Sequence, residues 1–341
     1  MVSSSNWTTQ MGLIRIKVDL TDNSESVDAG LNLTEATATM SAAQAVFCCF
    51  DLNIPHNSGS LGRIKVMLRE NCIASIPRFP HSYSVATTNM TDTIINAILA
   101  GFFQLGDGYG FSQGNMCNGA GTGVCSGKDW RLNGAPYVNQ MFMSAGGMPA
   151  SALTDGMHGM VNPVSVALVY RDSIEVSEQR FSLKVQYVRA VEDSCGAGRR
   201  RGGPASEIIF GPRHDEMLVI NICNGLINVP QGVLGGLPAK PGFQVRLSPD
   251  GGKEVYSTDA YCHLMPGDRL HTVDNGGGYG DPLDREAERV LTDVVERYVS
   301  LEQAEEVYGV VITGSRARDE LAVDANATET LRQSRRALAR A

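Results

Sequence analysis

The sequence predicts an α+β fold in three parts, and three observations support this prediction. Residues 1–130 combine strand-like runs with two long apolar segments nearly without charge, which indicates an α+β lobe with a mixed sheet and buried helices. Residues 131–284 carry short β-type runs separated by glycine and proline, as in a β-rich lobe of sandwich or barrel type. Residues 285–341 show charged, amphipathic patterns, which predict a C-terminal helical segment.

The first lobe is expected to alternate strands with helices. Ile14, Ile16, Val18 and Leu20 alternate with charged residues, which is the period-two pattern of a half-buried strand. The second helix is expected to begin near Asn89 or Thr91, either of which can serve as its N-cap. The predicted elements are strands at Leu13–Leu20 and Arg63–Leu68 and helices at Thr34–Phe50 and Thr91–Phe103, followed by an irregular segment at Gly106–Gly123.

The remaining elements follow from turn residues and helix caps. Ser300 and Gln303 form a capping box, which predicts the start of a short helix, and Gly309 is suited to end it. The predicted strands are Tyr137–Ser144, Val164–Tyr170, Phe181–Val191, Ser206–Phe210, Met217–Asn221 and Phe243–Leu247, and further helices are predicted at Glu286–Tyr298 and Ala325–Arg340.

Composition narrows the class of protein. The chain has 341 residues and a formal net charge of −8, which argues against nucleic acid as a standing partner. Its N-terminal residues lack the basic and apolar regions of a signal peptide, and no run of 18 apolar residues predicts a membrane span. Eight cysteines without a Cys-x-x-Cys pair favour a reducing compartment, so we expect a cytoplasmic protein.

The chain does not show a cofactor site of its own. No two of its six histidines lie within five residues of each other, whereas metal sites usually include a closely spaced pair of ligands. The glycine-rich segments lack the Lys-Ser/Thr of a P-loop and the third spaced glycine of a dinucleotide fingerprint. We therefore expect neither a metal nor a nucleotide to bind this chain by itself.

Polar side chains in loops are the best candidates for chemistry. Ser112, Gln113, Asn115 and Asn118 stand beside glycines, where they could hold a carbonyl or amide by neutral hydrogen bonds, or could instead satisfy buried loop backbone. His158, between two glycines, could be a general acid or base, or simply a solvated loop histidine. Both alternatives remain open from the residues alone.

Two glycine-rich loops are expected to be structural turns. Gly276, Gly278 and their neighbours permit positive φ and close backbone approach, and Asp281 precedes a proline that closes the loop. In the second loop, at 193–203, we expect Asp193 and Arg201 to form turn-fixing hydrogen bonds or an ion pair.

Several of these segments resemble, in order, those of the hydantoinase B/5-oxoprolinase/acetone carboxylase family. The loop Asp51-x-x-Ile54-Pro55-x-Asn57-x-Gly59 is similar to the family's "DPxIPxNxG". Residues 193–203 are similar to "DSGGAGxxRGG", and residues 276–282 match "GGGGYGDP". The segments at 18–32, 112–116, 235–238 and 298–311 also resemble family segments. The chain departs from the family at 86–92, which includes Asn89, and at 167–175, where substrate contacts would be expected.

The resemblance implies a subunit of an ATP-dependent amidohydrolase complex that opens a cyclic amide by phosphorylating its carbonyl oxygen. Alternatives are a subunit of an ATP-dependent ketone carboxylase, of the acetone or acetophenone type, and a non-catalytic structural subunit. The implied partners are a hydantoinase A-type ATP-binding subunit and a separate hydantoinase B-type polypeptide supplying the N-terminal half of a hetero-oligomer. ATP and a divalent metal (Mg, Mn or Zn) would then be held by partner subunits. A small-molecule substrate would bind at their junction, lined by Ser112, Gln113, Asn115 and His158 of this chain.

Overall fold

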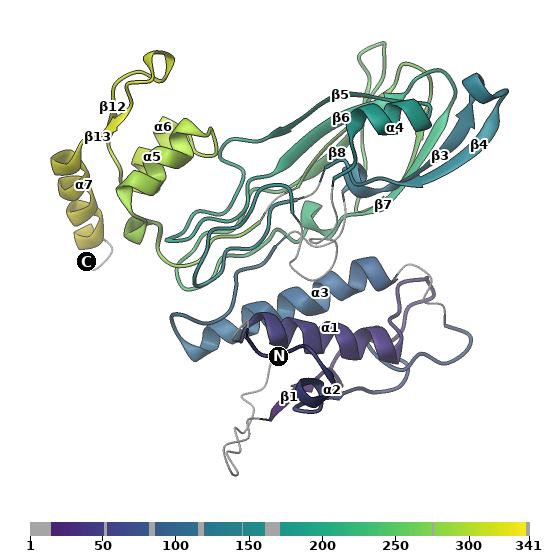
Figure 1. Cartoon of the computed structure of the whole chain (residues 1–341), viewed down its shortest axis with the longest axis horizontal. Coiled ribbons are helices and arrows are strands. Elements are labelled where there is room, and N and C mark those ends of the chain that lie inside the picture. The colour runs from purple at the N-terminus through teal and green to yellow at the C-terminus, as the bar shows by residue number, and fades with distance from the viewer. Residues whose placement is uncertain are drawn as a thin grey trace. The chain divides into compact units, whose positions relative to one another are not determined.

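The computed structural model describes residues 15–50, 53–81, 86–114, 119–144, 146–160, 171–274 and 276–338. They form two units, one of described residues up to Phe111 and one of described residues from Ser112 onward (Figure 1). The predicted α+β fold is confirmed, because the chain combines helices with antiparallel and parallel sheets. The predicted division at residues 130 and 284 stays a prediction. None of the described helices has the length and apolar character needed to cross a membrane.

The first unit packs helices on a small parallel sheet. Leu33, Ile95 and Leu99 are fully buried in its core, where α1 contacts both β2 and α3. Strand β1 pairs in parallel with β2, with Ile16 opposite Ile64 and Asp19 opposite Met67. The elements are β1 (Ile16–Asp19), α1 (Glu35–Cys48), α2 (Ser58–Leu61), β2 (Ile64–Met67) and α3 (Ala86–Gly101), which continues into a 3₁₀ turn at Phe102–Leu105.

The start of α3 differs from the sequence prediction. The helix begins at Ala86, so the predicted N-cap at Asn89 or Thr91 is wrong. Thr91 lies more than one turn inside the helix, where its hydroxyl is 3.3 Å from Ser41 Oγ on α1. Thr91 therefore makes a contact between two helices instead of capping one, and a helix-cap pattern in the sequence cannot distinguish these two roles.

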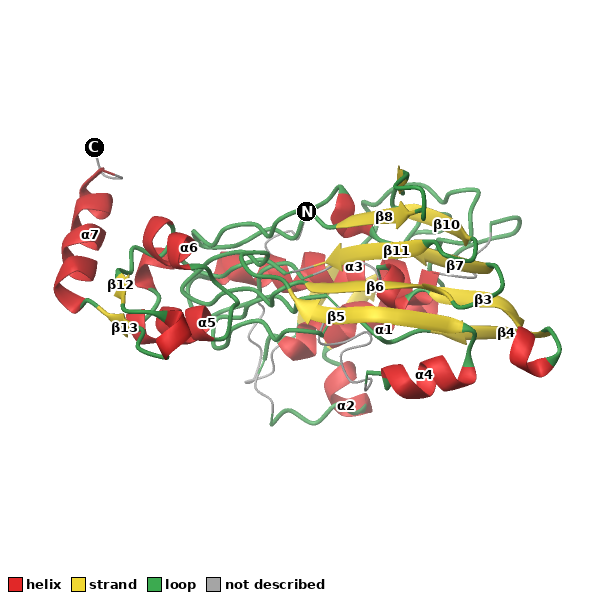
Figure 2. Cartoon of the chain, turned by 90° about the horizontal axis from the view of Figure 1, so that it is seen from above, coloured by secondary structure: helices red, strands yellow, loops and turns green. Residues whose placement is uncertain are grey.

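The second unit is a sandwich of two antiparallel sheets and not a closed barrel. One sheet has the order β10-β7-β3-β4 and the other β5-β6-β11-β8-β9 (Figure 2). Phe210 and Leu270 of one sheet and Val219 and Leu264 of the other share a single core. The strands are β3 (Val124–Asp129), β4 (Ala135–Gln140), β5 (Leu183–Ala190), β6 (Ser206–Pro212), β7 (Met217–Ile222), β8 (Phe243–Leu247), β9 (Lys253–Val255), β10 (Asp259–Leu264) and β11 (Arg269–Asp274).

Sequence patterns identified some of these strands and missed others. The predicted strand Phe243–Leu247 has the bounds of β8, and β4, β5, β6 and β7 overlap their predictions. The predicted strand Val164–Tyr170 lies outside the described residues. Strands β3, β9, β10 and β11 were missed because polar residues and glycine interrupt their apolar patterns, and pairing with distant strands decides their conformation.

Helices form the C-terminal part of the second unit. The capping box is confirmed, because Ser300 Oγ accepts a hydrogen bond from Gln303 N at 3.1 Å. Val290 and Val294 pack with Tyr308 in a core separate from that of the sandwich. The elements of this part are α5 (Ala287–Val295), α6 (Leu301–Glu306), β12 (Ile312–Thr313), β13 (Ala322–Val323) and α7 (Ala325–Leu338). A further helix of the second unit, α4 (Ile174–Arg180), lies earlier in the chain and precedes β5.

Candidate functional site

Extended glycine-rich segments of the second unit lie backbone against backbone. Gly196 N donates to Gly276 O at 2.9 Å, Gly203 N to Met148 O at 2.8 Å, and Gly278 N to Leu237 O at 3.0 Å. A Cβ atom on Gly278 would stand 2.1 Å from Ala197 O. We call the segments 146–150, 195–203, 231–237 and 276–280 the glycine lattice. Its segments lie so close that a Cβ on Gly196, Gly203, Gly276 or Gly278 would stand within 2.4 Å of a carbonyl oxygen, which leaves no room for a side chain at these four positions.

The sequence predicted that Gly276 and Gly278 serve both positive φ angles and close backbone approach, and the structure supports only the second reason. Within residues 276–280, only Gly280 has a positive φ, at 74°. Gly276 and Gly278 are instead required by close approach, because a Cβ on either would overlap a carbonyl oxygen of a neighbouring segment. Asp281 accepts a hydrogen bond from Leu283 N at 2.8 Å and so caps the 3₁₀ turn that follows the loop.

Asp193 and Arg201 join the second glycine loop to the C-terminal helices. Asp193 has a φ of 58°, and its carboxylate accepts a hydrogen bond from Ser300 N at the start of α6, at 2.8 Å. Arg201 Nε donates to Asp293 Oδ1 on α5 at 2.7 Å. The guanidinium also donates to the carbonyl oxygens of Gly156 and Gly202. The two residues therefore have different partners and do not pair with each other.

A buried ionic network surrounds Arg201. Arg285, 1% exposed, forms two hydrogen bonds to the carboxylate of Asp155, at 2.7 and 2.9 Å, and approaches Asp293 Oδ2 at 2.8 Å. Burial opposes ionisation of Asp155, yet hydrogen bonding and attraction to Arg285 outweigh it and lower the pKa of the carboxyl. Two arginines and two carboxylates thus fasten α5 to the glycine lattice.

Sequence reasoning missed Asp155, Arg285 and Asp293. Asp155 is 130 positions from Arg285 in the chain, and although Arg285 and Asp293 are only 8 positions apart, each has an unremarkable sequence environment. The available signal was the charge pattern after the 276–280 loop, where Asp284 and Arg285 follow Pro282 and Leu283. That pattern alone does not reveal which charges become buried.

His158 lies half-buried beside this network. Its Nδ1 is 3.2 Å from the carbonyl oxygen of Pro204, which can only accept, so Nδ1 carries the proton and Nε2 is the acceptor in the neutral ring. Burial lowers the pKa of His158, and the nearby arginines act in the same direction. The imidazole is 6.4 Å from the ring of Tyr298, over which the guanidinium of Arg201 stacks at 4.7 Å. The site therefore holds a neutral histidine that can accept a proton at Nε2.

Ser112 and Gln113 are occupied by the glycine lattice. Ser112 Oγ is buried, donates to Gly277 O at 2.7 Å and accepts from Ala150 N at 2.9 Å. Gln113 Oε1 accepts from Gln231 N at 3.1 Å. In this arrangement the serine has used its one donor, and both side chains hold backbone segments together.

The other predicted substrate-binding residues lie outside the described residues or in the first unit. Asn115 and Asn118 lie outside the described residues. Asn89 stands on α3 in the first unit, and its side chain also lies outside the description. Within the second unit, Ser112, Gln113 and His158 lie on or beside the same lattice but contact different partners. Among the described residues, no cluster of three or more His, Cys, Asp or Glu side chains could hold a metal.

Comparisons with known proteins agree on one family. Caprolactamase subunit beta from Pseudomonas jessenii is 28% identical over 279 residues, which cover 80% of this chain and 47% of that protein. The acetophenone carboxylase delta subunit from Aromatoleum aromaticum is 24% identical over 333 residues, covering 87% of this chain and 48% of that protein. The chain thus spans about half the length of these curated relatives.

A comparison with solved structures finds the same fold in a related enzyme. The crystal structure of ATP-dependent caprolactamase from Pseudomonas jessenii matches with a TM-score of 0.77 and 21% identity. The match covers 95% of this chain and 55% of that chain. The family profile described as hydantoinase B/oxoprolinase matches residues 7–282, which include the glycine lattice, the His158 loop and the strands of the sandwich. The chain therefore belongs to the hydantoinase B/oxoprolinase family.

Proposed function

We propose that this chain is a subunit of an ATP-dependent enzyme complex that opens a cyclic amide. The observation that carries the proposal is its similarity, over 80% of its length, to the beta subunit of caprolactamase, an enzyme named for a cyclic amide. The shared fold with an ATP-dependent caprolactamase supports the same reading.

The proposed chemistry activates an amide, which is a poor electrophile. Transfer of a phosphoryl group from ATP to the carbonyl oxygen forms ADP and a phosphorylated imidate. Water adds to its carbon and gives up a proton to a general base. The tetrahedral adduct expels the ring nitrogen, which takes up the proton held by the base and leaves as an amine, and a second water hydrolyses the resulting acyl phosphate to a carboxylate and inorganic phosphate. In this proposal, His158 Nε2 is the base, because the neutral ring has an acceptor there.

Cofactors and partners form part of the proposal. ATP is assigned to a hydantoinase A-type partner, and a divalent Mg, Mn or Zn ion to residues outside this chain. The relatives are about twice as long as the part that this chain matches. We propose that a further hydantoinase B-type segment, on this or another polypeptide, supplies the other half. We assign the complex to the cytoplasm, since no disulfide joins the cysteines of the described residues.

Two other functions have a specific observation in their favour. Carboxylation of a ketone is favoured by the 24% identity with an acetophenone carboxylase subunit over 87% of this chain. A non-catalytic structural role is favoured by Ser112 and Gln113, whose hydrogen bonds go to backbone segments.

The test uses the purified complex with ATP and a panel of lactams, hydantoins and oxoproline. Ring-opened product in mass spectra, with phosphate release that needs no bicarbonate, supports the proposed function. Turnover that requires bicarbonate and a ketone favours the carboxylase. In the same assay, His158→Ala is expected to lower kcat by about 100-fold or more. If the His158→Ala complex assembles properly and its kcat is unchanged, His158 is not the base, and the structural role of this chain is favoured.

A further inference from the structure

Among the described residues, the two-stranded sheet of the first unit has an edge without a paired strand, which we call the open edge. In the described part of the chain, β1 pairs with β2 alone, with bonds from Ile16 N to Arg63 O and from Leu20 N to Met67 O. Successive peptide groups of a strand point to opposite edges. The peptide groups of Lys17 and Asp19 therefore face away from β2.

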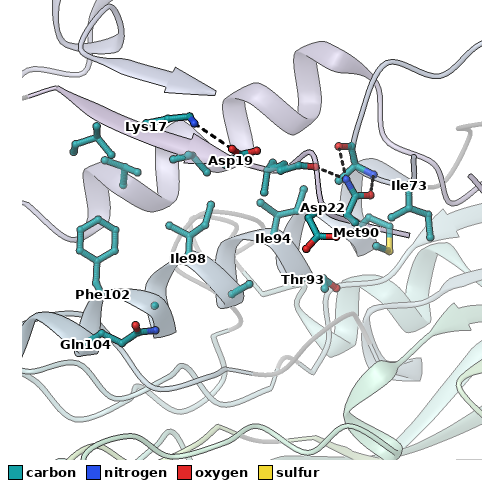
Figure 3. A pocket seen from close by; sticks show the side chains of 18 of the residues that line it. Lys17, Asp19, Asp22, Ile73, Met90, Thr93, Ile94, Ile98, Phe102 and Gln104 are labelled. Atoms are coloured by element: carbon teal, nitrogen blue, oxygen red, sulfur yellow. Dashed lines mark hydrogen bonds and ion pairs between the residues drawn. The ribbon is translucent and has the colours of Figure 1, made fainter. Parts of the chain in front are cut away.

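An apolar cavity of about 400 Å³ lies along this edge. Its lining from β1 includes Ile16 and Val18, and its lining from α3 and the following turn includes Ile94, Ile98 and Phe102. Figure 3 shows the side chains of Ile94 and Ile98 on α3 directed toward the strand that carries Lys17 and Asp19. Helix α1 packs on β2, whereas this stripe of α3 faces the space beside β1. The cavity thus occupies the position that a third strand of the sheet would fill.

We propose that the open edge of β1 and the apolar stripe of α3 form a docking groove for an extended strand of another polypeptide. The strand would pair with the peptide groups of Lys17 and Asp19 and place alternate apolar side chains against α3. Two-stranded sheets are marginally stable, and parallel sheets are normally covered on both faces, so an added strand stabilises this unit. The inference does not depend on the reaction that the complex carries out.

The length of the groove fits a short strand. The lining on α3 and its 3₁₀ turn runs from Met90 to Leu105, and the 15 helical steps between these residues span roughly 22 Å. A strand covers that distance with about seven residues at about 3.3 Å each. A small apolar molecule could fill the volume, but it would leave the peptide groups of Lys17 and Asp19 without partners.

Charge at one end of the groove indicates the chemistry of the strand. Asp19 and Asp22 line that end, and Lys17 Nζ, at 3.2 Å, already pairs with Asp19. Asp22 is exposed, and Figure 3 shows it beside Met90 and Thr93. The incoming strand should therefore carry a lysine or arginine at this end and apolar residues along its length.

The probe is a labelled seven-residue peptide with valine at alternate positions, threonine between them and lysine at one end. Its binding to the full chain is followed by fluorescence anisotropy. The control peptide has proline in place of the central threonine, which prevents strand pairing. We expect the control to bind at least about tenfold more weakly.

Two variants test the two walls of the groove. Lys17→Pro removes an N–H at the open edge that does not serve the pairing with β2, and Ala97→Phe fills the groove from the exposed side of α3. Ala36→Phe is the matched control, because Ala36 is an exposed alanine on α1 that does not line the cavity. Circular dichroism and thermal melting verify folding.

We expect binding to fall at least about tenfold in Lys17→Pro and in Ala97→Phe, and to stay within about twofold in Ala36→Phe. Equal binding of the proline peptide, or undiminished binding by folded Ala97→Phe, would overturn the proposal. Self-association of the chain that is lost in the same variants would also overturn it, because the occupant would then be a second copy.

Discussion

At the residue scale, the glycine lattice replaces side-chain packing with contact between backbones. Gly147, Gly202 and Gly278 each lie so close to a carbonyl oxygen of another segment that a Cβ would stand 1.9 to 2.1 Å away. Real Cβ contacts are never this short, so the backbone would have to move. The hydrogen bonds between these segments depend on that close approach.

Gly278→Ala should destabilise the second unit by about 3 kcal/mol or more, because the neighbour that must move is backbone rather than a flexible side chain. Gly62→Ala is the control, since its nearest neighbour would be 3.3 Å away and its φ is −63°. Urea unfolding of both variants measures the difference. If Gly278→Ala unfolds like the native chain, close approach does not explain the glycine.

The buried ionic network makes a second residue-scale prediction. Arg285→Met leaves Asp155 without its main partner and Asp293 with Arg201 alone, and should cost about 3 to 5 kcal/mol. Arg289→Met is the control, because Arg289 is half-exposed and only reaches Asp155 at 3.5 Å; its effect should stay within about 1 kcal/mol. Similar effects of the two variants in chemical denaturation would contradict the assigned role of the network.

The same network sets a pH dependence. The pKa of Asp155 is lower in the folded chain than its ordinary 3.8, so its pairing stabilises the fold above that pH and is lost as the pH falls through the folded pKa. Below about pH 4 the native chain should therefore lose stability through this group, and Arg285→Met should lose less. Denaturant midpoints across this range provide the measurement. Parallel curves would show that Arg285 does not set the pKa of Asp155.

At the scale of elements, local signals identified caps better than strands. The start of α6 depends on Ser300 and Gln303, which are neighbours in sequence, and the structure confirms that cap. Strand β3 depends on pairing with β4 and with the distant β7. Its sequence contains glycine, lysine and aspartate and has no clear alternation. A cap can be predicted from four residues, whereas a central strand requires its partners.

Ser300→Ala should lower stability by about 1 kcal/mol, because it removes the acceptor for Gln303 N at the start of α6. Ser334→Ala is a suitable control: its hydroxyl bonds only to Leu331 O within exposed α7, so the change should be within about 0.5 kcal/mol. Thermal melting of both variants compares them. A neutral Ser300→Ala would mean that the bond from Ser300 N to Asp193 is sufficient to start the helix.

At the scale of the whole molecule, the described side chains include no cluster of three or more His, Cys, Asp or Glu residues that could hold a metal, and the glycine-rich segments of the sequence lack the Lys-Ser/Thr of a P-loop. The isolated chain should therefore give no heat of binding when titrated with ATP or with Mg, Mn or Zn ions, and binding should appear only with its partner subunits. Isothermal titration calorimetry on the chain alone and on the co-expressed complex makes the comparison. Stoichiometric binding by the chain alone would contradict this assignment of ATP and metal.

The sequence by itself determined the family, the α+β class, the buried helices and the two glycine-rich loops, because these features are encoded in runs of neighbouring residues. It also identified His158 and Ser112 as notable without assigning their partners. Tertiary structure decided that Ser112 binds backbone, that His158 presents Nε2 as an acceptor, and that Arg201 pairs with Asp293 rather than Asp193. These outcomes depend on contacts between residues 38 to 165 positions apart, whose geometry arises only when the sheets and loops pack together.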